Sequence, residues 1–109
     1  SPVGLLVHDR SGLFISYRGA LALPDRIALP AVSASSPCRL CKDQPCLTAC
    51  PVGALGVKGY DVPECRAYIS SISGQACVES GCAVRRACPV SARHGRLPEQ
   101  SAFHMRAFT

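Results

Sequence analysis

Eight cysteines in 109 residues form two runs, and each run ends in Cys-Pro. The first run holds Cys38, Cys41, Cys46 and Cys50, and the second holds Cys65, Cys77, Cys82 and Cys88. Four thiolates hold one four-iron, four-sulfur cluster, and a Cys-x2-Cys start with a Cys-x3-Cys-Pro end is typical of such sites. Two [4Fe-4S] clusters would therefore use all eight thiolates and leave none over.

The same thiolates allow three other interpretations. Two structural zinc sites would use them, but such sites usually contain two tight Cys-x2-Cys pairs, and only Cys38 and Cys41 form one here. One cluster with spare thiols is a second alternative. A disulfide scaffold is the third, and it would need an oxidising compartment. Residues 1–10 lack the features of a secretory signal, and no stretch is long enough to cross a bilayer. We therefore expect a cytoplasmic protein, without membrane association, whose reduced thiols bind metal.

The positive charge of the chain changes once the clusters are counted. The net charge is +5, and two oxidised clusters with four thiolates each carry about −2 apiece, which leaves roughly +1. Four arginines fall close together without an acid among them: Arg85, Arg86, Arg93 and Arg96. We expect them to balance cluster charge and to form solvated surface, with a patch for an acidic partner or RNA as alternatives. The expected partner is a redox protein, a reductase or flavoprotein, and not a nucleic acid, while the oligomeric state stays open.

Hydrophobic patterning predicts one small α+β domain with little regular structure. Residues 3–8 and 13–18 are apolar enough for strands, and the turn between them ends in a glycine, so we expect an N-terminal β-hairpin. A further short strand is expected near residues 20–23. Short helices are expected over residues 46–50, 61–73, 79–88 and 99–108. The second of these is the best defined, because Asp61 and Glu64 resemble a capping box. In the last helix, Phe103, Met105 and Phe108 are expected to cover the core.

Residues 38–55, which end in Cys-Pro-Val-Gly-Ala-Leu, resemble the first cluster motif of bacterial dicluster ferredoxins. In those proteins the last cysteine of a motif binds the cluster of the other motif. The resemblance therefore implies two ligand sets that cross between the runs. The first set would be Cys38, Cys41, Cys46 and Cys88, and the second set would be Cys50, Cys65, Cys77 and Cys82.

Over residues 3–91 the chain is also similar to the iron–sulfur module of epoxyqueuosine reductases and reductive dehalogenases. A glycine-bearing strand pair, a Leu-Pro segment, a cysteine-bearing helix and a final Gly-Cys … Cys-Pro follow in the same order. The resemblance implies three parts of one 1–109 domain: a hairpin arm (1–30), a dicluster ferredoxin-like core (37–91) and a tail (92–109). Those enzymes carry a cobalamin domain upstream, for which the 37 residues before Cys38 are too few. We therefore expect an electron carrier and not an enzyme, with the relay module of a larger reductase as the alternative.

The chain departs from the family pattern in both cysteine runs. Four residues separate Cys41 from Cys46 where the family usually has two, so residues 43–45 are expected to bulge outward. In the second run, Arg85 stands where the family has an inner cysteine. Cys77 is the one cysteine left to replace it, which is why it completes the second set.

Overall fold

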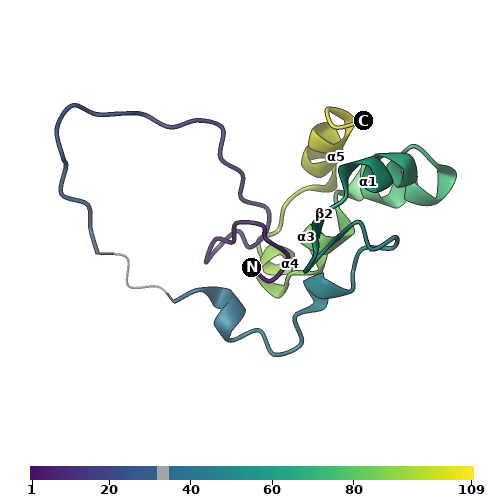
Figure 1. Ribbon diagram of the computed structural model, residues 1–109, viewed down its shortest axis with the longest axis horizontal. Coiled ribbons are helices and arrows are strands. Elements are labelled where there is room, and N and C mark those ends of the chain that lie inside the picture. The colour runs from purple at the N-terminus through teal and green to yellow at the C-terminus, as the bar shows by residue number, and fades with distance from the viewer. Residues whose placement is uncertain (32–34) are drawn as a thin grey trace.

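The computed structural model describes residues 1–31 and 35–109, and their regular structure is α+β as expected (Figure 1). Five α-helices follow in order: α1 (Val62–Ile69), α2 (Gln75–Ser80), α3 (Ala83–Ala87), α4 (Pro89–Arg93) and α5 (Pro98–Arg106). Strands β1 (Leu55–Gly56) and β2 (Gly59–Tyr60) pair antiparallel, with Leu55 opposite Tyr60. Three single 3₁₀ turns cover Pro37–Arg39, Pro45–Leu47 and Ile72–Gly74.

The hydrophobic core is small and contains two of the cysteines. Its buried members come from the N-terminus, the first cysteine run, β1 and α3: Val3, Leu13, Cys46, Leu55, Val84 and Cys88. Val84 has no exposed surface at all, and Leu13 is 1% exposed. Because these side chains are far apart in the sequence, the core fixes the N-terminal segment, the first cysteine run and α3 against one another.

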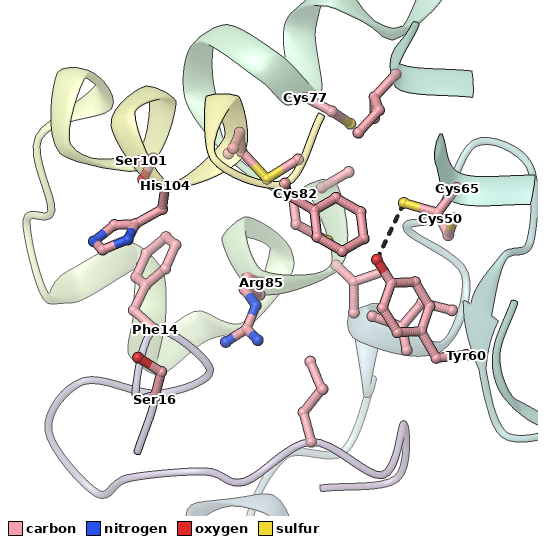
Figure 2. Close-up of a pocket in the computed structure, with 18 of the residues that line it drawn as sticks. Phe14, Ser16, Cys50, Tyr60, Cys65, Cys77, Cys82, Arg85, Ser101 and His104 are labelled. Carbon is pink, nitrogen blue, oxygen red and sulfur yellow. Dashed lines mark hydrogen bonds between the residues drawn. The ribbon is translucent and has the colours of Figure 1, made fainter. Parts of the chain in front are cut away.

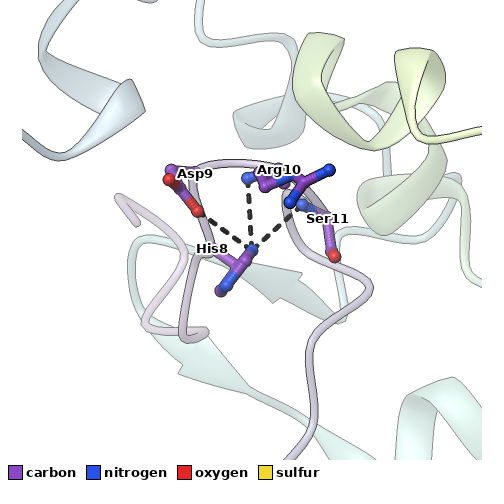
Figure 3. Close-up of polar contacts among 4 residues, drawn as sticks. All are labelled: His8, Asp9, Arg10 and Ser11. Carbon is purple, nitrogen blue, oxygen red and sulfur yellow. Dashed lines mark hydrogen bonds and ion pairs between the residues drawn. The ribbon is translucent and has the colours of Figure 1, made fainter. Parts of the chain in front are cut away.

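The expected N-terminal hairpin is reduced to its turn, so that prediction was wrong for the two strands. His8 and Gly12 exchange both backbone hydrogen bonds at 3.0 Å, and no further pair of residues extends this bridge. The turn itself is held by the Nδ1 atom of His8, which accepts hydrogen bonds from the backbone N–H groups of Arg10 and Ser11 (Figure 3). The Oδ1 atom of Asp9 lies 3.1 Å from the same nitrogen.

Side chains of α3 and α4 form hydrogen bonds with the backbone groups that the second strand of a hairpin would use. The N–H of Leu13 donates to the Oγ of Ser91 at 2.8 Å. The guanidinium of Arg85 donates to the carbonyl oxygen of Leu13 and, at 3.3 Å, to that of Ile15. These partners lie 70 to 78 residues away in the sequence, which is why the local pattern predicts a strand where the structure has a tertiary contact.

Arg18 still contacts His104 of α5, and beyond it residues 19–31 leave the body of the molecule as an extended arm, in which the strand expected at residues 20–23 is not formed (Figure 1). All residues of this arm are exposed, including Leu21 at 91% and Leu29 at 77%. The arm raises the radius of gyration to 15.5 Å, compared with about 13 Å for a compact chain of this length. A strand needs a neighbour for its backbone hydrogen bonds, and nothing in the described part of the chain pairs with the arm.

The helices around the second cysteine run are shorter than the sequence predicted. Asp61 caps α1 as expected, since its Oδ1 accepts the N–H of Glu64 at 3.0 Å. However, α1 ends at Ile69, and a 3₁₀ turn follows before α2. The helix expected over residues 79–88 is divided at Gly81, whose φ of +91° no helix tolerates. The division creates α2 and α3 with different directions, so cysteines on both can face one cavity.

Two smaller expectations are also corrected. The segment expected as a helix at residues 46–50 forms only the 3₁₀ turn Pro45–Leu47. The last expected helix is present as α5, but Phe103 is 67% exposed and does not cover the core. In residues 1–31 and 35–109, no helix combines the length and the apolar character that crossing a membrane would require.

Candidate metal centres

The four cysteines of the second set line one cavity of about 390 Å³ (Figure 2). Cys50 ends the first run, Cys65 lies in α1, Cys77 in α2, and Cys82 immediately before α3. Tyr60 and Phe108 stack on each other, with ring centroids 6.3 Å apart, and both line the same cavity. None of the other four cysteines lines this cavity.

Hydrogen-bond donors point at the sulfur atoms of the second set. The hydroxyl of Tyr60 donates to the Sγ of Cys65 at 3.3 Å (Figure 2). Burial raises the pKa of the Cys82 thiol, but backbone N–H groups of Arg85 and Val84 and the positive charge of Arg85 act against that rise. Donors of this kind stabilise a thiolate, the form in which cysteine binds metal.

The first set lies outside this cavity, and two of its members belong to the core. Cys46 is 7% exposed and Cys88 is 9% exposed, while Cys38 and Cys41 are half-buried. Burial raises the pKa of Cys46, and the charges of Cys38, Cys41 and Cys88 raise it further. Each of those three thiols is therefore close enough to Cys46 to interact with it electrostatically.

Cys88 differs from Cys46 and Cys82 because its environment favours ionisation. Burial alone would raise its pKa, but hydrogen bonds to its sulfur outweigh this effect and lower the pKa. The donors are the backbone N–H groups of Ser91, Val90 and Leu13 and the hydroxyl of Ser91. Ser91 is 1% exposed. It therefore joins the N-terminal segment to the thiol of Cys88 inside the core.

The two sets are held a short distance apart by α3. Cys82 precedes this helix and belongs to the second set, whereas Cys88 follows it and belongs to the first set. With a rise of 1.5 Å per residue, six residues place these cysteines about 9 Å apart. Cys46 and Cys50 connect the same two sets through the first run. Each run therefore contributes cysteines to both sets.

The cysteines of the second set line a space and do not converge on one point. Within residues 1–31 and 35–109, no three His, Cys, Asp or Glu side chains approach closely enough to hold a single metal ion. In a tetrahedral zinc site the Zn–S bonds of about 2.3 Å bring the sulfurs to about 3.8 Å from one another. A cluster with four irons and four sulfides needs a wider frame of thiolates, which is the kind of space that the second set lines.

Sequence reasoning missed several polar side chains that support these sets. Tyr60 and Ser91 donate to cysteine sulfurs, and no spacing rule points to either of them. The bulge expected at residues 43–45 is consistent with the backbone, since Gln44 has a φ of +38° and Asp43 is exposed.

Comparisons of the chain with protein-family models, with curated proteins and with solved structures found no match.

Proposed function

We propose that this protein is a ferredoxin-type electron carrier that binds two [4Fe-4S] clusters. Cys38, Cys41, Cys46 and Cys88 would hold the first cluster, and Cys50, Cys65, Cys77 and Cys82 would hold the second. Such clusters accept and release single electrons, and the chain supplies the thiolates, the hydrogen bonds to sulfur and the protein environment that set their potentials. The physiological partner would be a reductase or flavoprotein.

The observation that carries this proposal is a single cavity lined by four cysteines. The cavity contains four cysteines from both runs, and the charges acting most strongly on Cys46 come from the other three members of its own set. This crossed arrangement is the one that the resemblance to dicluster ferredoxins implies. Because Cys82 and Cys88 flank α3, about 9 Å apart along its axis, the two proposed clusters would lie near each other and could exchange electrons.

Metal and sulfide analysis of anaerobically purified protein tests the proposal. We expect about eight irons and eight sulfides per chain, together with a brown colour that bleaches with dithionite. Colourless protein with two zinc ions and no sulfide would identify the structural zinc alternative instead. Four irons per chain would leave one set without a cluster and contradict the two-cluster assignment.

A second candidate is the electron-relay module of a larger epoxyqueuosine-reductase-like oxidoreductase. The observation that favours it is the exposed arm, where Leu21, Leu23, Ile27 and Leu29 are between 57% and 91% exposed. Isolated carriers rarely leave so many large apolar side chains in water, and a covering domain would bury them. Sequencing the complete gene product discriminates the two, since a catalytic domain in the same polypeptide favours the module.

A further inference from the structure

The cavity of the second set carries positive charge that no carboxylate balances. Arg18, Arg85 and Arg96 line it, and none of its lining residues is an Asp or Glu. Across residues 1–31 and 35–109, no arginine pairs with an aspartate or glutamate side chain. The arginines of the cavity therefore have no acidic side chain beside them, and the charge of Arg85 acts on the Cys82 thiol.

Neutral partners fix two of these arginines in place. Arg85 is half-buried in α3, three residues after Cys82, and its guanidinium donates to backbone carbonyl oxygens of the N-terminal segment. Arg96 donates to the carbonyl oxygen of Phe14 at 3.3 Å and lies 5.0 Å from the centre of that ring. Figure 2 shows Arg85 between Phe14 and Tyr60, on the cavity wall below Cys82. Carbonyl groups hold the guanidinium groups but do not neutralise them.

Among the described residues, the core around Cys46 and Cys88 contains no lysine or arginine, and Arg39 and Lys42, next to Cys38 and Cys41 in the sequence, are exposed. Cys46 and Cys88 pack against apolar side chains of the core, including Leu13 and Val84. Hydrogen bonds to Cys88 favour negative charge there, and those to Cys82 and Cys65 do so in the second set. Hydrogen bonds thus favour negative charge in both sets, while the fixed positive charge of Arg85 acts on the second set. A reduced site carries one more negative charge, which a nearby cation stabilises and an apolar core disfavours.

We infer that Arg85 makes the second set the site of higher reduction potential, so that an electron taken up by the protein comes to rest there. This inference rests on the proposed function. One electron from a one-electron donor enters the protein and moves from the first set to the second, and no bond forms or breaks. A guanidinium at the edge of the site shifts the partition of that electron by about tenfold. For a one-electron couple this equals about 59 mV.

An anaerobic redox titration of the loaded protein, followed by electron paramagnetic resonance, tests this order. Wild-type protein should show two one-electron midpoints. Arg85→Gln should lower the higher midpoint by about 59 mV and leave the other in place. Arg85→Lys, which keeps the charge, should preserve both midpoints, as should Arg93→Gln on the exposed surface of α4. Cys77→Ser should remove the higher-potential wave and so assign it to the second set.

Three results would overturn the inference: unchanged midpoints in Arg85→Gln, an equal shift of both midpoints, or equal shifts in the Lys and Gln variants. Loss of the lower-potential wave in Cys77→Ser would overturn it as well. If Arg85→Gln takes up no clusters, Arg96→Gln replaces it. A smaller fall of the higher midpoint alone then supports the inference, and no fall overturns it. Wild-type protein without clusters would instead contradict the proposed function.

Discussion

A single methyl group at Gly12 should detach the N-terminal segment from the cysteine core. Gly12 has a φ of +58°, and an added Cβ would lie 2.4 Å from the backbone nitrogen of Ser91 and 2.5 Å from its Oγ. Neither atom can move easily, because Ser91 is buried in α4 and its hydroxyl bonds to both Leu13 and Cys88. In Gly12→Ala the turn must therefore move away from α4.

The cost has three contributions that the structure allows us to estimate. A left-handed conformation costs a non-glycine residue about 1–2 kcal/mol. Loss of the 2.8 Å hydrogen bond between Leu13 and Ser91 removes about 1 kcal/mol. Partial exposure of Leu13, now 1% exposed, removes a further 1–2 kcal/mol, roughly. The sum is about 3–5 kcal/mol, a large part of the stability of a small domain.

Thermal unfolding of loaded protein, followed by circular dichroism at one fixed scan rate under anaerobic conditions, measures this effect. Gly4→Ala is the matched control, because Gly4 also has a positive φ, +73°, but has no atom within 4 Å of the added Cβ. The control should lose only the stability that corresponds to the left-handed conformation, about 1–2 kcal/mol. Gly12→Ala should therefore melt about 10 °C or more below Gly4→Ala. Equal melting temperatures would refute the idea that contact with Ser91 anchors the N-terminal segment.

Two further substitutions test the second set and the helix division that builds it. Cys77→Ser should roughly halve the iron content and leave one intact cluster visible by electron paramagnetic resonance. A full complement of iron with an unchanged spectrum would show that Cys77 is not a ligand. Gly81→Ala places a Cβ at a φ of +91° and 2.8 Å from the Cβ of Ser101, which should destabilise the protein by about 1–3 kcal/mol. Gly53→Ala, with a φ of +67° and no atom within 4 Å, is its control. An equal loss of stability in both variants would show that the close approach of Gly81 to Ser101 of α5 does not matter.

Local sequence signals predicted those elements whose stabilising partners lie nearby in the chain. The start of α1 follows from Asp61 and Glu64, which meet through a hydrogen bond across three residues. The turn at residues 9–12 and the helix α5 are local in the same sense. The grouping of the cysteines into two ligand sets is what the family resemblance implies, and it stays a prediction.

The failed predictions share a different cause, which is competition from distant side chains. The hairpin is absent because Arg85 and Ser91 bind the backbone of residues 13–15, and a propensity scale contains no such term. The division at Gly81 was readable in principle, since a glycine directly after helical residues is a common helix end. Its consequence, a bend that turns Cys77 and Cys82 toward one cavity, depends on the packing of α2 against α5.

Under the proposed assignment, the crossed ligand sets and the small core would make cluster binding and folding one process. Cys46 and Cys88 are core residues as well as proposed ligands, so occupation of the first set would stabilise the packing of Leu13 and Val84. Because α3 has a proposed ligand of a different set at each end, fixing either set restricts this helix and favours the other. Arg85 adds a second connection, since the same guanidinium holds the N-terminal segment and faces the second cavity. Under this proposal a change in either set would affect the whole domain, and the redox order and the stability would depend on the same few residues.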